Sequence, residues 1–274
     1  MSKSNLTTRT ITGLLYGLSL IGSLILSHYS FYLFFLVVLI IGLKEFYQLV
    51  ENKDVKPQKT LGFIISIALF ISSYFYFINS HISQLILSII LLLTFLLFAV
   101  ELFRNKEISF INIGSTILGI IYVALPLSIL SFLAFDNNNN TYNYEIILSL
   151  FILVWLSDVG GYFAGINFGK HKLLERVSPK KTWEGVGGGV VLCLIGAYIL
   201  SQFLPLMSTA QWLLFGAIVC ISSVIGDLIE SMLKRSANVK DSGDILPGHG
   251  GILDRFDSVL FVIPIAYIFK LFIL

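Results

Sequence analysis

Charge is scarce in this chain of 274 residues, because Asp, Glu, Lys and Arg together make up only 12% of it. A soluble domain carries about twice that share, so the composition excludes an ordinary soluble protein. Hydrophobic residues make up 56% of the chain and gather in long apolar runs. Such runs predict an all-α, polytopic integral membrane protein. They argue against an outer-membrane barrel, whose strands alternate apolar and polar residues.

Cysteine is nearly absent as well. The two cysteines, Cys193 and Cys220, both lie inside apolar runs. Two isolated thiols of this kind indicate neither a disulfide framework nor a zinc site. We therefore expect both to be small, buried packing residues.

Nine apolar segments are long enough to cross a membrane, which takes about 20 residues of helix each. They cover residues 10–27, 29–49, 60–79, 82–103, 111–135, 145–166, 184–203, 210–232 and 256–273. The first has the basic start and apolar centre of a signal peptide, but it lacks a small-residue cleavage site. We therefore interpret it as a retained first span.

Lys and Arg are almost missing from one side of these spans. If the nine spans alternate in direction, all of the 18 Lys and Arg except Lys270 fall on the side of the N-terminus. Cytoplasmic connections carry the excess of Lys and Arg in membrane proteins. The pattern predicts a multi-pass protein of the cell (inner) membrane, with its N-terminus in the cytoplasm and its C-terminus outside.

The chain is expected to form a single membrane domain with two unequal parts. Residues 1–135 show no ionisable group deep in a span, so we assign their helices to scaffolding, dimerisation and lipid contact. Residues 145–274 carry carboxylates and cations within or at the ends of the last four spans. Such groups are costly at membrane depth and are usually functional, so we expect the catalytic site in this second part, facing the cytoplasm.

Two glycine-rich segments carry the first candidates. Asp158 lies inside the sixth span, followed by glycines whose spacing lets helices approach closely. It could form a buried pair with a lysine or face a substrate cavity. Ser178-Pro179 predicts a helix start, with Lys180 and Lys181 just behind it, where backbone N–H groups and cations favour anions. The two lysines alone are also typical of a cytoplasmic membrane anchor.

The last two spans add more carboxylates. Asp227 and Glu230 share one helix face with Lys234, and Asp254 and Asp257 share a face of the ninth span. Clustered carboxylates suit Mg²⁺, which is usually held by one or two of them together with substrate phosphates. The cations expected around the same place are Lys180, Lys181, Lys234, Arg235 and Lys240. This combination indicates an enzyme of phosphoryl-type transfer.

A secondary transporter is the competing class, because intramembrane carboxylates can couple ion movement to transport. The charges, however, concentrate in cytoplasmic connections rather than at the midplane, and no inverted repeat is visible. His249 stands alone in a glycine-flanked turn of the expected loop 236–251, which is more typical of a structural than of a catalytic histidine. We expect no nucleic-acid partner.

The segment "SMLKRSANVKDSGDILPGHGGILDRFDS" at 231–258 closely resembles the signature of the phosphatidate cytidylyltransferase (CDP-diacylglycerol synthase) family. The matching residues are Ser231, Lys234, Arg235, Lys240, Asp241, Gly243, Pro247, His249, Gly250, Gly251, Asp254, Arg255 and Asp257. The segments "SPKKTWEG" at 178–185 and "SDVGGYFAG" at 157–165 also resemble parts of that family. The resemblance covers about residues 154–260, and the first half matches only in being apolar and of suitable length.

The resemblance implies a transfer of the cytidylyl group from CTP to phosphatidate, which gives CDP-diacylglycerol and pyrophosphate. It also implies Mg²⁺ dependence, a homodimer, and an acceptor whose tails stay in the lipid bilayer. A related CTP-dependent transferase or kinase acting on an isoprenoid or ether lipid is the alternative within enzymes.

Residue roles follow from the same resemblance. Asp227 and Asp254 would ligate the metal, with Asp257 as a third ligand or the holder of a second cation. Phosphates would be bound by Lys234, Arg235, Ser178, Lys180 and Lys181. The remaining candidates for substrate contact are Asp158, Ser231, Lys240, Asp241, His249 and Arg255. The resemblance requires no side-chain nucleophile and identifies no general base.

Overall fold

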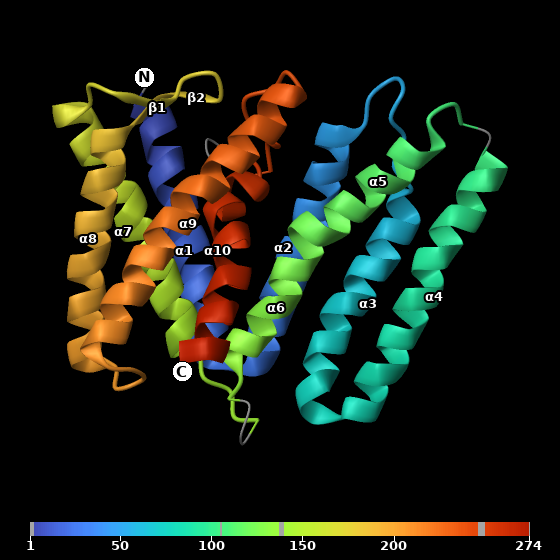
Figure 1. The fold of residues 1–274 in the computed structure, drawn as a ribbon, viewed down its shortest axis with the longest axis horizontal. Coiled ribbons are helices and arrows are strands. Elements are labelled where there is room, and N and C mark those ends of the chain that lie inside the picture. The colour runs from blue at the N-terminus through green and yellow to red at the C-terminus, as the bar shows by residue number, and fades with distance from the viewer. Residues whose placement is uncertain (1–2, 105, 137–139, 246–249, 274) are drawn as a thin grey trace. The chain divides into compact units, whose positions relative to one another are not determined.

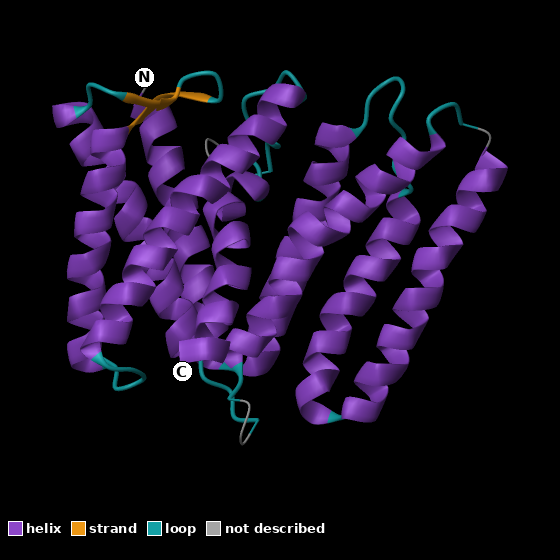
Figure 2. Cartoon of the chain, viewed as in Figure 1, coloured by secondary structure: helices purple, strands orange, loops and turns teal. Residues whose placement is uncertain are grey.

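The computed structural model describes residues 3–104, 106–136, 140–245 and 250–273, with side chains described from residue 10 onward. The chain divides into two compact units. The first comprises Met1–Tyr142 and Asp241–Arg255, and the second comprises Asn143–Lys240 and Phe256–Leu274. Helices dominate both units, which confirms the all-α membrane class (Figure 2).

The first unit is built mainly from its N-terminal helices (Figure 1). In chain order these are α1 (Lys3–Leu26), α2 (His28–Val50), α3 (Lys59–Ile78), α4 (Ser80–Arg104), α5 (Ser109–Gly119), the π-helical turn η1 (Ile120–Ala124) and α6 (Leu125–Ala134). The segment 241–255 joins these helices and carries the second half of the signature loop. The elements α5, η1 and α6 together form one span, Ser109–Ala134.

The second unit holds the remaining elements (Figure 1). They are α7 (Glu145–Phe168), β1 (Lys172–Leu174), β2 (Ser178–Thr182), α8 (Trp183–Phe203), α9 (Thr209–Ser236) and α10 (Leu253–Ile273). The first three residues of α10 belong to the first unit, and the helix continues from there into the second.

Among the described residues, eight helical segments are long and apolar enough to cross a membrane. They correspond to the second to ninth spans expected from the sequence. The expected first span lies in α1, whose apolar part covers Thr10–Leu26.

Close packing of α7 against α8 depends on glycine, as the sequence predicts. A Cβ on Gly160 would lie 2.6 Å from the carbonyl oxygen of Gly188, and a Cβ on Gly189 would lie 3.0 Å from that of Ser157. A side chain at either position would therefore force the two backbones apart. This contact sets the spacing of the helices that carry much of the candidate site.

The expected helix start at Ser178-Pro179 is wrong. Residues Ser178–Thr182 form β2, which pairs antiparallel with β1, so that Lys172 faces Thr182 and Leu174 faces Ser178. Helix α8 begins only at Trp183, where the Thr182 hydroxyl caps it by accepting a hydrogen bond from Gly185 N at 3.1 Å. The hairpin satisfies backbone groups that a helix start would have left open, and it carries Lys180 and Lys181 on a strand.

The first half is also less apolar inside than expected, because two buried carboxylates lie in its spans. Glu101 of α4 is 2% exposed and accepts hydrogen bonds from Gln58 Nε2, Arg104 Nη1 and Asn112 Nδ2 at 2.7–2.8 Å. Glu45 of α2 is 1% exposed. Buried carboxylates are stable only when hydrogen-bonded or paired, so each marks a place where chain segments are tied together.

Candidate functional site

A cavity of about 580 Å³ lies within the second unit. Its walls come from α7, β2, α8 and α9. The charged side chains that line it are Asp158, Lys180, Lys181 and Asp227. All four are among the residues proposed from the sequence, and the fold brings them to one place from three separate segments. This size lies within the range of about 300–1,000 Å³ that is usual for small-molecule sites.

Glycines open this cavity at its α7 and α8 walls. Gly161 and Gly165 of α7 face Gly185 of α8, and all three line the cavity. A Cβ on Gly161 would lie 3.6 Å from the carbonyl oxygen of Gly185, and one on Gly165 would lie 3.5 Å from Thr182 Oγ1. A Cβ on Gly185 would lie 2.9 Å from the carbonyl oxygen of Gly161, so a side chain there would push α7 and α8 apart at the cavity wall.

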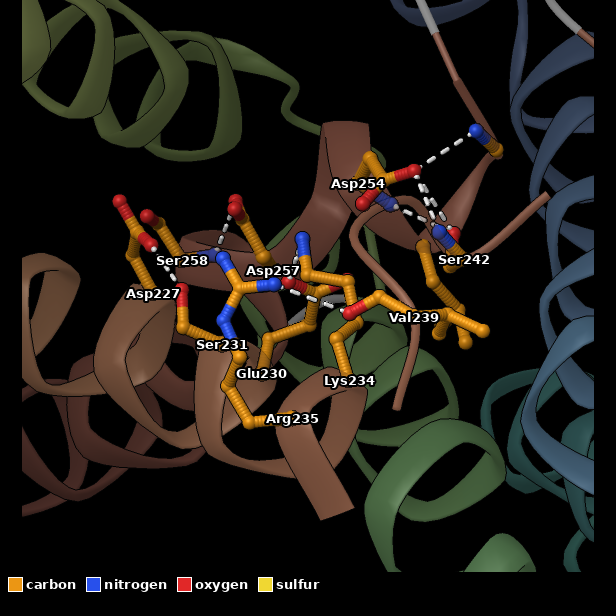
Figure 3. A network of polar contacts seen from close by, with 12 residues as sticks. Asp227, Glu230, Ser231, Lys234, Arg235, Val239, Ser242, Asp254, Asp257 and Ser258 are labelled. Atoms are coloured by element: carbon orange, nitrogen blue, oxygen red, sulfur yellow. Dashed lines mark hydrogen bonds and ion pairs between the residues drawn. The ribbon is translucent and has the colours of Figure 1, made fainter. Parts of the chain in front are cut away.

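An ion pair joins two of the charged walls. Lys181 Nζ lies 2.7 Å from Asp227 Oδ2, and the two side chains are 26% and 28% exposed. Asp227 Oδ1 also accepts a hydrogen bond from Ser231 Oγ at 3.2 Å (Figure 3). A half-buried pair is screened less by solvent than a surface pair, so the contact fixes both side chains against the cavity.

Helix α10 brings a further carboxylate to α9 within the same unit. A Cβ on Gly226 would lie 3.0 Å from the carbonyl oxygen of Asp257 and 3.0 Å from Ser258 Cα, so the two helices touch at the residue before Asp227. Asp257 Oδ1 accepts a hydrogen bond from Ser258 N at 2.6 Å. Asp257 also interacts electrostatically with Asp227 and Asp158. The second unit therefore groups three carboxylates, two of which line the cavity.

The end of α9 carries the two cations of the signature (Figure 3). Lys234 forms an ion pair with Glu230, which is fully buried, as the shared helix face predicts. Arg235 is exposed, and its Nη1 donates to the carbonyl oxygen of Val239 at 3.0 Å. This hydrogen bond holds the residues that follow α9 close to the C-terminal end of the helix. Asp257 lies within electrostatic range of Lys234.

Asp254 belongs to the first unit, and there it organises the signature loop. Its Oδ2 accepts hydrogen bonds from Ser242 N at 2.8 Å, Ser242 Oγ at 3.0 Å and Gly251 N at 2.8 Å (Figure 3). Among the residues that the structure describes, no group of three or more His, Cys, Asp and Glu is arranged to hold a metal ion. The metal-binding roles expected of Asp227, Asp254 and Asp257 stay predictions.

The other candidates have varied surroundings. Ser178 is half-buried in β2, and Ser231 is half-buried on α9. Lys240, Asp241 and Arg255 are exposed. His249, together with Leu246, Pro247 and Gly248, lies outside the described residues.

Sequence reasoning missed Glu45. Its Oε1 accepts a hydrogen bond from Ile252 N at 3.0 Å, and its Oε2 accepts from Leu253 N at 2.8 Å and from Ser242 Oγ at 3.2 Å. All of these partners belong to the first unit and to the signature segment. The one available signal was an acid within the apolar run of the second span, next to Lys44.

Comparisons with known proteins agree over nearly the whole chain. The model of the cytidylyltransferase family matches residues 7–273. The phosphatidate cytidylyltransferase of Bacillus subtilis (strain 168) is 34% identical over 242 residues, which cover 85% of this chain and 87% of that protein. The proteins of the same name from Staphylococcus saprophyticus and Staphylococcus haemolyticus are 36% and 34% identical. These matches cover 90% of both chains for the former, and 95% of this chain and 97% of the relative for the latter.

Proposed function

Because this chain belongs to the cytidylyltransferase family, we propose that the cavity of its second unit is where the transfer takes place. The protein is a multi-pass membrane nucleotidyltransferase that transfers a cytidylyl group from CTP to phosphatidate for phospholipid synthesis. The observation that carries the proposal is the Lys181–Asp227 pair, which puts a fixed cation and a fixed carboxylate side by side in the lining of one cavity.

The reaction forms one bond and breaks one. An oxygen of the phosphatidate phosphate bonds to the α-phosphorus of CTP. The bond from that phosphorus to the bridging oxygen breaks, and pyrophosphate leaves with the electron pair. A phosphate monoester is mostly dianionic near pH 7, so it needs little help from a base. The work left to the protein is to align the two phosphates and to stabilise the charge that moves onto pyrophosphate.

Lys180 and Lys181 are suited to that work. Both line the cavity from β2, and the pairing of β2 with β1 fixes the strand that carries them. Asp227 holds the ammonium of Lys181 in place before a substrate arrives, so little side-chain entropy is lost when a phosphate binds. Lys234 and Arg235 at the end of α9 provide further cations in the same unit.

The carboxylates of the second unit fit a magnesium ion. Carboxylate oxygens are the ligands that Mg²⁺ prefers, and it usually needs only one or two of them beside substrate phosphates. Asp227 and Asp257 interact as like charges on neighbouring helices, an arrangement that a divalent cation would stabilise. We assign these two as the residues that would hold the ion, with Asp254 as a further candidate. Bound there, Mg²⁺ would neutralise phosphate charge.

The setting in the membrane explains why such an enzyme is polytopic. Phosphatidate keeps its acyl tails in the bilayer, so its phosphate must be met at the membrane surface. We propose that this surface is the cytoplasmic one, because nearly all Lys and Arg lie on that side of the expected spans. We also propose a homodimer, on the family resemblance alone.

The decisive assay uses purified protein in detergent with CTP, Mg²⁺ and a panel of acceptors. The panel contains phosphatidate, an ether-linked phosphatidate, an isoprenoid phosphate and an isoprenoid alcohol. We expect pyrophosphate release and a CDP-lipid product with phosphatidate, and little of either with the isoprenoids. Folded protein that releases no pyrophosphate with phosphatidate would overturn the proposal. A clear preference for an isoprenoid acceptor would favour the related lipid transferases instead.

A further inference from the structure

Glu45 is a buried carboxylate in the half of the chain that carries none of the signature. It lies on α2, is 1% exposed, and accepts hydrogen bonds from Ile252 N, Leu253 N and Ser242 Oγ. The first two partners stand at the start of α10, and the third lies on the signature loop. A single side chain from α2 is thus hydrogen-bonded to both ends of the segment 242–253.

The chemistry of a helix start explains the first two bonds. The first backbone N–H groups of a helix have no partner within the helix, and the helix dipole favours negative charge beside them. In α10 the residues before and at the helix start, Ile252 and Leu253, donate to the two oxygens of one carboxylate. Glu45 therefore caps α10 from another helix.

Glycines in the signature loop allow the Glu45 carboxylate to come close to the loop backbone. A Cβ on Gly251 would lie 2.5 Å from Glu45 Oε2, and one on Gly243 would lie 2.7 Å from Glu45 Oε1. Gly250 has a φ of +82°, a conformation that favours glycine, and a Cβ there would lie 2.5 Å from Asp254 Oδ2. Three of the glycines in the signature segment thus leave room for two carboxylates.

Ser242 connects these two carboxylates. Its hydroxyl lies 3.2 Å from Glu45 Oε2 and 3.0 Å from Asp254 Oδ2, and its one proton can serve only one of them at a time. Its backbone N–H donates to Asp254 as well, at 2.8 Å. Glu45 therefore holds Asp254 in two ways, through Ser242 and through the start of the helix on which Asp254 stands.

We propose that Glu45 is a positioning residue for cytidylyl transfer, acting through Ser242 and the first turn of α10. In this role it needs no contact with either substrate. It fixes the helix turn that carries Asp254 and, three residues further along, Asp257. The inference rests on the proposed function in one respect, namely that these two aspartates serve the reaction.

The test compares Glu45→Gln with Glu101→Gln, its matched control. Both glutamates are buried in the first unit and accept several hydrogen bonds, but those of Glu101 come from α4, from α5 and from the connection before α3. We expect Glu45→Gln to lower kcat about 10- to 100-fold, because a misplacement of about 1 Å can cost about 100-fold in rate. The KM for CTP should change less than about threefold. Glu101→Gln should lower the melting temperature and leave kcat within about twofold.

Hydrogen exchange gives a readout that is independent of activity. In Glu45→Gln the amides of Gly251, Ile252 and Leu253 should exchange faster, whereas the amides of α7 and α8 should not change. If wild-type protein fails to transfer cytidylyl to phosphatidate, the proposed function fails, while the exchange data still test whether Glu45 holds the loop. Unchanged exchange at these amides would overturn the inference.

Ser242→Ala provides a second variant in case Glu45→Gln does not fold. It keeps the bonds of Glu45 to Ile252 and Leu253 and removes only the shared hydroxyl. We expect a several-fold loss of kcat from Ser242→Ala alone. The double variant should lose less than the product of the two single effects, because both act on one network. The inference is also overturned if kcat is unchanged in both single variants, or if Glu45→Gln and Glu101→Gln lose activity in proportion to their loss of stability.

Discussion

Lys181 Nζ and Asp227 Oδ2 lie 2.7 Å apart, which joins strand β2 to helix α9 in the lining of the second unit's cavity. The pair has two functions in the proposed mechanism. The ammonium is held ready for a phosphate, and the carboxylate is held ready for a cation. When substrate and metal bind, each partner of the pair gains a new opposite charge.

Lys181→Gln should lower kcat/KM for CTP about 10- to 100-fold, because a hydrogen bond to a charged group contributes about 1.5–3 kcal/mol. The loss follows from the missing phosphate contact rather than from unfolding, since the side chain is only half-buried. Steady-state kinetics with CTP varied at saturating phosphatidate measures it. Lys170→Gln is the control, because Lys170 is exposed in the connection before β1 and should leave kcat/KM unchanged. Equal losses in the two variants would contradict the assignment.

Asp227→Asn should reduce kcat more than 100-fold, because the amide keeps the shape of the side chain and loses the charge that holds Lys181 and a metal. Expression, size on gel filtration and melting temperature should stay close to wild type. Asp54→Asn is the matched control, since Asp54 is exposed in the α2–α3 connection. Near-wild-type activity in Asp227→Asn would show that the proposed cation site is misplaced.

Removal of Mg²⁺ by a chelator should abolish pyrophosphate release, and added Mg²⁺ should restore it. Mg²⁺ also binds free CTP, so this result alone does not locate the ion on the protein. Asp257→Asn should therefore be compared with wild type in a Mg²⁺ titration at fixed CTP. We expect the Mg²⁺ concentration for half-maximal activity to rise in the variant. The same concentration in both proteins would exclude Asp257 as a ligand.

Local spacing in the sequence predicted much of the second unit. The Glu230–Lys234 pair follows from a separation of four residues on a helix, and the close contact at Gly160 and Gly188 follows from glycine-rich helices. The family resemblance stated from residues 154–260 is confirmed by the family model and by the relatives.

Contacts between residues far apart in the sequence account for the features that local patterns did not predict. Glu45 accepts a hydrogen bond from Leu253, a residue 208 positions later, and no local pattern in the sequence links the two. The helix start expected at Ser178 is wrong because pairing with Lys172–Leu174 decides the local structure, and the sequence SPKKT has no alternation of apolar and polar residues that would predict a strand. The Lys181–Asp227 pair likewise depends on how β2 packs against α9.

The orientation of the chain can be tested with introduced cysteines. The native Cys193 and Cys220 are fully buried and should not react with a membrane-impermeant maleimide in intact cells. Ala210→Cys, exposed in the first turn of α9 beside a cation-free connection, should be labelled from outside, because the cation distribution puts it outside the cell. Asp54→Cys, in the cation-rich α2–α3 connection, should be labelled only after the cells are opened. The reverse pattern would invert the proposed topology and the side on which CTP is used.

Two neighbouring glycines of α8 give a sharp test of the helix contact that shapes the cavity. A Cβ on Gly188 would clash with Ala164 Cβ and lie 2.8 Å from the carbonyl oxygen of Gly160, whereas a Cβ on Gly187 would meet nothing within 4 Å. Both replacements by alanine gain about 1 kcal/mol of helix propensity. Only Gly188→Ala adds an overpacking cost of about 1–3 kcal/mol.

We therefore expect Gly187→Ala to melt at or above the wild-type temperature and Gly188→Ala to melt below it. Thermal unfolding can be followed in detergent with a thiol-reactive dye, because unfolding exposes the buried Cys193 and Cys220. Gly188→Ala should also lose activity at temperatures where it remains folded, since a wider α7–α8 spacing moves Asp158 away from Lys181 across the cavity. Equal melting temperatures for the two variants would show that α7 and α8 can separate without cost, and the cavity would then not depend on their contact.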